Sequence, residues 1–159
     1  MDIRKYIEEQ LADLNQGLDE DGSCLIEIDD DRECVIVLQE AAETVLFCVN
    51  VAAAEELDHD GLYERLLVMN FLDDVTRGAA LGLTPDGEVI AIRLTLNARD
   101  IGVGDIERIV ARLAELAERI DRDLKDRRHG TGEIEGTESE AAFPAPSSDE
   151  PEVGPAKYA

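Results

Sequence analysis

The sequence predicts an α+β fold built on a twisted, mostly antiparallel sheet. Alternating apolar and polar residues recur from 24 to 51 with only short polar turns between the runs, which is typical of an antiparallel meander. A second pair of alternating runs flanks a Pro-Asp-Gly turn at 85–87, a pattern that indicates a hairpin. Helical apolar spacing is confined to separate stretches. Runs of strands separated from helices favour an α+β fold over a doubly wound α/β fold.

We expect the elements to follow the order α-β-β-β-α-β-β-α. The first helix places Ile3, Ile7 and Leu11 on one narrow stripe, with Tyr6 beside it. The last helix begins at an Asp105 cap and carries a long apolar stripe on one side. The expected helices span 2–15, 61–72 and 105–127, the expected strands span 24–28, 33–39, 44–51, 79–84 and 88–96, and a polar break is expected at 73–78.

The length of 159 residues suits one domain and a tail. Apolar residues make up 44% of the sequence but aromatic residues only 4%, so the core must consist mainly of Leu, Ile, Val and Ala. After residue 128 the composition shifts to Gly, Glu, Ser, Thr, Ala and Pro, which bury too little apolar surface to offset the entropy of ordering. We therefore predict an α+β domain over 1–128 and a disordered acidic tail over 129–159.

Acidic residues dominate the charge of the whole chain. The 38 Asp and Glu residues against 15 Lys and Arg residues give a formal net charge of -23, and the excess is spread over the predicted domain as well as the tail. This field repels the phosphates of nucleic acids and anionic membrane surfaces, so we expect neither as a partner. It favours basic or amphipathic protein partners.

Cysteine usage indicates the cytoplasm, and the N-terminus indicates either the cytoplasm or export by a route that the N-terminus does not reveal. The three cysteines form no CxxC pair, and we expect them to be buried, reduced thiols rather than zinc ligands: Cys24, Cys34 and Cys48. The chain begins with acids and lacks the apolar core of a signal peptide. No apolar run approaches membrane-spanning length, so membrane insertion is not expected.

We predict no catalytic, cofactor-binding or metal-binding residues. The acidic runs at 19–22 and 29–31 lack the ligand spacing of a calcium loop, and in so acidic a chain they are more typical of solvated turns. His59 lies between two aspartates, but no nucleophile or glycine-rich turn accompanies it, and its position suits a helix entry. A metal-assisted enzyme that uses an acidic run stays open as a third hypothesis, which calorimetry with Ca²⁺ or Mg²⁺ would test.

The stretch from 66 to 83 predicts that the protein is not a monomer. Its helical part, up to residue 72, is apolar almost all the way round, whereas a surface helix of a small domain normally has one apolar stripe and one charged face. The helix therefore needs two packing partners, of which its own sheet is one. In a chain this short we expect the other to be a second copy, giving a homodimer.

From 66 to 96 the sequence reads LLVMNFLDDVTRGAALGLTPDGEVIAIRLTL, followed by a loop, an acid-capped amphipathic helix and the acidic end. This pattern resembles the class I type III secretion chaperones, the CesT or Tir-chaperone family, over residues 1–127. The most specific part is the helix with Asn70, followed by Thr76 and Gly78 before the next strand. Small size, strong acidity and the order of elements are also similar to that family.

The resemblance implies a bacterial cytoplasmic homodimer without enzymatic activity, which binds the N-terminal segment of a secreted effector in extended form and keeps it ready for secretion. It also implies that the second long helix and the following strand form the dimer interface, at Leu66, Leu67, Asn70, Phe71, Val75, Ala79, Ala80 and Leu81. We expect effector contacts from the first helix and from exposed apolar strand positions, at Ile3, Tyr6, Ile7, Leu25, Val35 and Val37. The alternative is an acidic homodimeric adaptor of the same fold that serves no secretion system.

Overall fold

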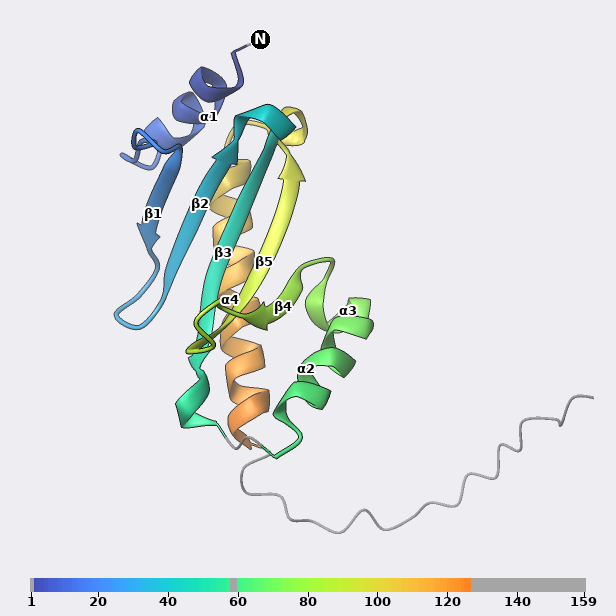
Figure 1. Cartoon of the computed structure of the whole chain (residues 1–159). Helices are drawn as coiled ribbons and strands as arrows, with labels where there is room; N and C mark the ends of the chain where they lie inside the picture. The colour runs from blue at the N-terminus through green and yellow to red at the C-terminus, as the bar shows by residue number, and fades with distance from the viewer. Residues whose placement is uncertain (1, 58–59, 127–159) are drawn as a thin grey trace, which may run out of the picture.

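A computed structural model describes residues 2–57 and 60–126 of the chain. The elements follow the predicted α+β order, with one added helical turn (Figure 1). The helices are α1 (Ile3–Ala12), α2 (Leu62–Phe71), α3 (Asp73–Thr76) and α4 (Asp105–Asp126), and the strands are β1 (Ser23–Glu27), β2 (Glu33–Gln39), β3 (Thr44–Ala53), β4 (Ala80–Leu83) and β5 (Val89–Asn97). Short 3₁₀ turns lie at Glu40–Ala42, Ala54–Glu56 and Ala98–Asp100. The predicted tail and His59 lie outside the described residues.

The strands form one antiparallel sheet in the order β1-β2-β3-β5-β4, which confirms the predicted fold class. β3 and β5 form the long centre of the sheet and pair from Thr44 opposite Asn97 to Ala53 opposite Val89. β4 is short and pairs only with β5, so β4 and β1 are the two edge strands. Short turns join β1 to β2, β2 to β3 and β4 to β5, whereas β3 and β5 pair although α2, α3 and β4 lie between them in the sequence.

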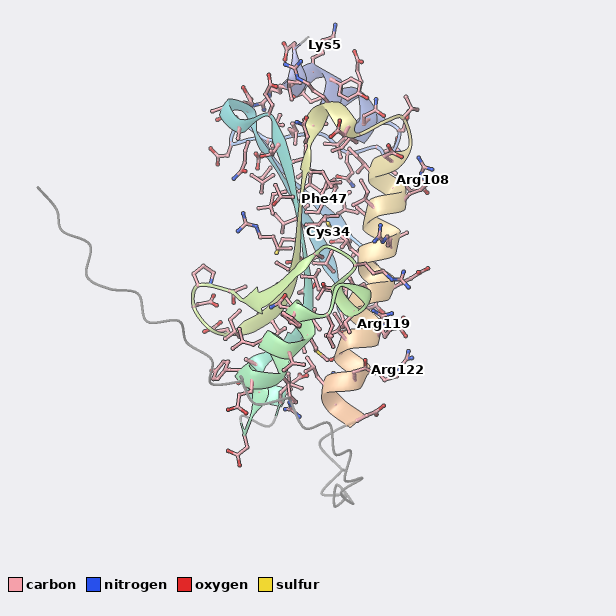
Figure 2. All side chains as sticks on the ribbon, turned by 90° about the vertical axis from the view of Figure 1, so that its right-hand side faces the viewer. Lys5, Cys34, Phe47, Arg108, Arg119 and Arg122 are labelled. Atoms are coloured by element: carbon pink, nitrogen blue, oxygen red, sulfur yellow. The ribbon has the colours of Figure 1, made fainter. Side chains whose placement is uncertain are left out.

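The core lies between the sheet and α4, which runs along one sheet face (Figure 1). Figure 2 shows Phe47 and Cys34 between the sheet and α4, and both side chains are fully buried. The apolar stripe of α4 meets the sheet because its members recur every three or four residues. The largest fully buried side chains are Phe47, Ile7, Leu11, Ile36, Leu62, Ile90, Ile92, Ile101, Ile106, Ile120, Val45 and Val49. The core is therefore mainly aliphatic, as the composition predicts.

α3 is a single helical turn within 73–78, where the sequence predicts an irregular break. The carbonyl oxygen of Leu72 accepts a hydrogen bond from the N–H of Thr76 at 3.3 Å, which closes the turn. Arg77 and Gly78 then have φ angles of 53° and 83°, and this left-handed pair ends the turn and directs the chain into β4. The turn is too short to show a repeating apolar pattern, so periodicity does not predict it.

Candidate protein-binding surfaces

One side of α2 exposes a row of large apolar side chains. Phe71 is 88% exposed and Leu67 is 70% exposed. Their neighbours on the helix and at its C-terminal end are exposed as well, and we call the set the α2 surface: Tyr63, Leu67, Val68, Phe71 and Leu72. An apolar patch of this kind on a small, highly charged protein is typical of a contact site for another molecule.

The opposite side of α2 packs within the protomer. Leu62 is fully buried and Leu66 is 5% exposed. Asn70 joins the helix to β4, because its Nδ2 donates to the Leu81 carbonyl oxygen at 2.6 Å and its Oδ1 accepts from the Leu81 N–H at 2.7 Å. One amide side chain thus satisfies both backbone groups of an edge-strand residue. α2 therefore has one side engaged in the protomer and one side open.

The predicted dimer-interface residues fall into three groups. Leu67, Phe71 and Ala80 are exposed, Asn70 and Val75 are half-buried, and Leu66, Ala79 and Leu81 are buried in the protomer. Three further exposed residues that the sequence reasoning missed are Tyr63, Val68 and Leu72. Tyr63 lies four residues before Leu67 and Val68 lies three residues before Phe71, and these helical spacings are the signal that identifies them, whereas Leu72 follows the end of the helix. The exposed group is available to a second copy without any rearrangement of the protomer.

Replacing Asn70 by Ala is expected to lower the free energy of unfolding by about 2–4 kcal/mol, because both backbone groups of Leu81 lose their partner. Glu64→Ala is the matched control, since Glu64 is exposed on the same helix and its loss should change the free energy by less than about 0.5 kcal/mol. Urea denaturation at one fixed protein concentration measures both variants. Equal stability of the two variants would contradict the structural role of Asn70.

A second exposed apolar area lies on the sheet face opposite α4, which carries no helix within the described residues (Figure 1). Leu25 lies opposite Val35, Val35 lies opposite Cys48, and Val37 lies opposite Leu46. We call the five residues in these pairs the outer-face cluster: Leu25, Val35, Val37, Leu46 and Cys48. Leu25 is 49% exposed, and the other four side chains are half-buried. Because side chains alternate along a strand, the same strands fill the core with their other face.

α1 packs on the core rather than over this open face. Ile7 is fully buried, and Ile3 is 8% exposed. Tyr6 is half-buried, and its hydroxyl donates to the Ile101 carbonyl oxygen at 2.5 Å. The predicted effector-contact residues of the first helix thus hold α1 on the domain, whereas the three predicted strand positions lie in the outer-face cluster. The two β3 members of that cluster were not predicted, although the alternation of β3 identifies them.

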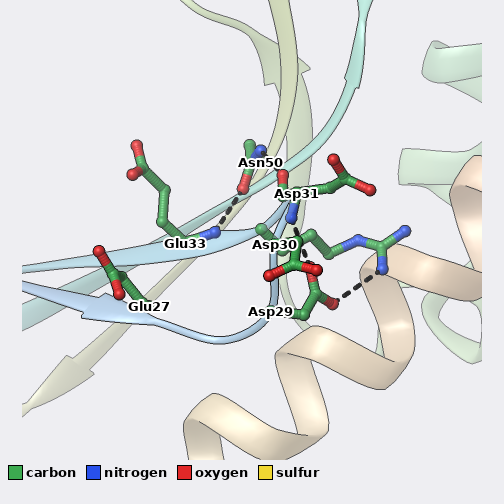
Figure 3. Close-up of a pocket in the computed structure, with 7 residues that line it drawn as sticks. Glu27, Asp29, Asp30, Asp31, Glu33 and Asn50 are labelled. Atoms are coloured by element: carbon green, nitrogen blue, oxygen red, sulfur yellow. Dashed lines mark hydrogen bonds and ion pairs between the residues drawn. The ribbon is translucent and has the colours of Figure 1, made fainter.

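The β1–β2 turn carries the acidic run 29–31, which lines a pocket of about 360 Å³ (Figure 3). The turn itself uses the Asp29 carboxylate, whose Oδ1 accepts from the Asp31 N–H at 3.0 Å and whose Oδ2 lies 3.4 Å from Arg32 Nη1. Across residues 2–57 and 60–126, no group of three or more His, Cys, Asp or Glu residues is arranged to hold a metal ion. The Asp29 member of the run is therefore part of the hydrogen bonding that shapes the turn.

The cysteines are free thiols with depressed reactivity. Burial raises the pKa of Cys34 to about 12, and burial also raises the pKa of Cys24 and of Cys48. A thiol that stays protonated near neutral pH is a poor nucleophile and a poor metal ligand. Cys48 is only half-buried, which corrects the prediction that all three are buried, because its position on β3 faces away from α4.

The sequence profile of the Tir chaperone protein (CesT) family matches residues 6–121, from the first turns of α1 into the second half of α4. The chain belongs to this family. The match includes both exposed apolar surfaces and confirms the resemblance seen in the sequence. This family is one of type III secretion chaperones and not a class of enzymes. Chaperone function in type III secretion is therefore assigned by family membership.

Solved structures agree with this assignment of the chaperone fold. A chain of the ExsC–ExsE complex has a TM-score of 0.71 and 20% identity, covering 78% of this chain and 97% of that chain. A chain of the HopA1–SchA chaperone–effector complex has a TM-score of 0.59 and 17% identity, with coverages of 78% and 94%. A chain of the ExoU–SpcU complex from the type III secretion system of Pseudomonas aeruginosa has a TM-score of 0.57 and 20% identity, with coverages of 76% and 98%.

At these identities the three likenesses establish the fold alone. A search of curated proteins found no significant match to the chaperone. Among its described helices, none has both the length and the apolarity needed to cross a membrane.

Proposed function

We propose that the chaperone is a homodimer in the bacterial cytoplasm that holds the N-terminal segment of a secreted effector in extended form until type III secretion. It acts by binding, without catalysis. The observation that carries this proposal is the pair of separate apolar surfaces on α2 and on the outer sheet face of a protomer whose core is already packed. One surface serves the second copy and the other serves the effector.

The α2 surface suits a second copy because a two-fold axis brings the same patch of two protomers together. Fully burying a Val, Leu or Phe side chain contributes about 1.5–3 kcal/mol, and the exposed parts of the α2 surface amount to about three such side chains per protomer, so a dimer that buries both copies gains roughly 9–19 kcal/mol. Association costs about 4–15 kcal/mol in lost translational and rotational freedom. Apolar burial at the α2 surface is therefore of the size needed to offset the cost of forming the dimer.

The outer-face cluster suits an extended apolar segment. Leu25, Val35 and Cys48 form a row across three neighbouring strands, which lie about 4.8 Å apart. β1 is an edge strand beside this row, so a client strand can pair with its free backbone groups while alternate client side chains reach the cluster. The strong negative charge of the chaperone favours a client segment with basic flanks.

The direct test is to purify the chaperone from the cytosol of its own bacterium and identify the proteins that accompany it. We expect a stoichiometric secreted protein, and limited proteolysis of the complex should leave the N-terminal segment of that protein protected. A folded partner without a protected N-terminal segment would instead support the acidic adaptor of the same fold. Recovery of the chaperone only in a membrane or secreted fraction would contradict the proposed location.

A further inference from the structure

Arg93 is the only basic residue in the five described strands. It lies on β5, its side chain is exposed, and it stands opposite Cys48 on the outer sheet face. Among the described residues its guanidinium has no hydrogen-bond or ion-pair partner, although the whole chain has a net charge of -23. This cation beside the outer-face cluster is therefore available to a bound molecule.

Arg93 extends the outer-face cluster into a straight row across the sheet. Leu25 lies opposite Val35, and Val35 lies opposite Cys48. Cys48 in turn lies opposite Arg93. Residues directly opposite each other on neighbouring strands share a face, so the row runs from apolar side chains to one guanidinium. Because neighbouring strands lie about 4.8 Å apart, the three strand spacings from Leu25 to Arg93 cover about 14 Å.

The length of the row matches two steps of an extended peptide. Side chains on one face of an extended chain repeat about every 6.8 Å, so residues i, i+2 and i+4 cover about 14 Å. A client segment that crosses the outer face with residue i over Leu25 places residue i+4 over Arg93, and residue i+2 lies between them. Apolar side chains suit the first two positions, and a carboxylate suits the guanidinium at the third.

The charges of the sheet favour a client carboxylate at Arg93 rather than at the far end of the row. Glu27 and Glu33 lie opposite each other at the ends of β1 and β2, and both are exposed. They repel a client carboxylate beside Leu25, and the net negative charge of the chaperone disfavours acidic residues in a client generally. An acid in the client thus gains an attractive contact at Arg93.

We propose that Arg93 determines client specificity by pairing with an acidic residue of the bound segment, in the pattern apolar-x-apolar-x-acidic read in either chain direction. This inference rests on the proposed function, because it requires the client segment to lie on the outer-face cluster. The apolar contacts supply most of the affinity, and the ion pair fixes the register of the segment along the row.

Selection from a phage library of random dodecapeptides on the immobilised full-length chaperone tests the proposal. We expect the unmodified chaperone to enrich the pattern apolar-x-apolar-x-acidic, and we expect Arg93→Glu to enrich Lys or Arg at the third patterned position. Arg93→Lys keeps the positive charge and should keep the preference for an acid. Because the net charge of the chaperone disfavours acidic peptides, enrichment of an acid at one position requires a local cation.

Two failures of this selection are distinguishable. Enrichment of alternating apolar residues without a preferred acid would overturn the role of Arg93 and leave the client surface in place. The double variant Leu25→Asp with Val37→Asp should enrich none of these peptides. If it enriched the same peptides, or if the unmodified chaperone enriched none, the outer-face cluster would not be the client site, and the proposed function would fail together with this inference.

Fluorescence anisotropy with the most enriched peptide measures the size of the effect. Arg93→Glu should weaken binding by about tenfold or more, since a charged hydrogen bond is replaced by repulsion. Arg122→Glu is the matched control, because it makes the same charge change at an exposed arginine of α4, and its affinity should stay within about twofold. Equal losses in the two variants, or a changed oligomeric state of Arg93→Glu in light scattering, would overturn the proposal.

Discussion

Phe71→Asp is expected to convert the dimer to a folded monomer. Phe71 is 88% exposed in the protomer and adds nothing to its core, so its loss should leave the fold intact. In the proposed dimer the change removes about 1.5–3 kcal/mol of apolar burial per protomer and places an unpaired carboxylate in the interface. Because each substitution occurs twice across a two-fold axis, we expect dimerisation to weaken by roughly 10³-fold or more. Sedimentation equilibrium measures the effect directly.

Val103→Asp is the control for this experiment. Val103 is 76% exposed but lies in the loop before α4, away from the α2 surface. The Val103→Asp protein carries the same additional charge and should remain a dimer with an unchanged circular dichroism spectrum. A Phe71→Asp protein that stays dimeric at the same concentration would show that the dimer forms elsewhere or does not use α2. If both variants became monomeric, charge rather than apolar contact would explain the loss.

Leu25→Asp combined with Val37→Asp is expected to abolish co-purification of the effector while the dimer persists. Both residues lie in the outer-face cluster, and neither belongs to the α2 surface. The double change removes two apolar contacts and places two carboxylates against an apolar client segment. We expect affinity to fall by about 100-fold or more, which corresponds to about 3 kcal/mol. Pull-down of the co-expressed effector, with light scattering of the chaperone alone, separates binding from folding.

Thr95→Asp provides a control on the same sheet face. Thr95 is on β5, opposite Leu46 of β3, and its polar side chain is exposed. The Thr95→Asp substitution therefore adds a charge beside the outer-face cluster without removing an apolar contact. Effector binding should persist in this variant. Binding retained by the double variant would show that the effector uses another surface, and binding lost equally in the Thr95→Asp control would point to a general effect of charge.

Much of the fold follows from local pattern. The sequence predicts β2 at 33–39, and the structure places it at Glu33–Gln39, because a polar turn on each side limits the alternating run. The start of α4 at Asp105 matches the predicted span 105–127, although the Asp105 carboxylate accepts from the Gly102 N–H before the helix rather than from the first turn. The apolar residues on two sides of α2 also indicated that the core of one protomer could bury only one of these sides. These features depend on residues close together in the chain, so a single sequence determines them.

Only the tertiary structure decided which side of each helix packs against the core and which side is exposed. A helix that is apolar almost all round has no polar side to fix its orientation, so packing had to decide that Leu66 turns inward while Phe71 turns outward. The same applies to Asn70, whose two hydrogen bonds to Leu81 depend on how α2 approaches the edge of the sheet. Ile7 illustrates the reverse case, since a narrow stripe predicted a surface contact and the fold buried it completely. Orientation depends on contacts between residues distant in sequence, and these exist only once the sheet and helices have come together.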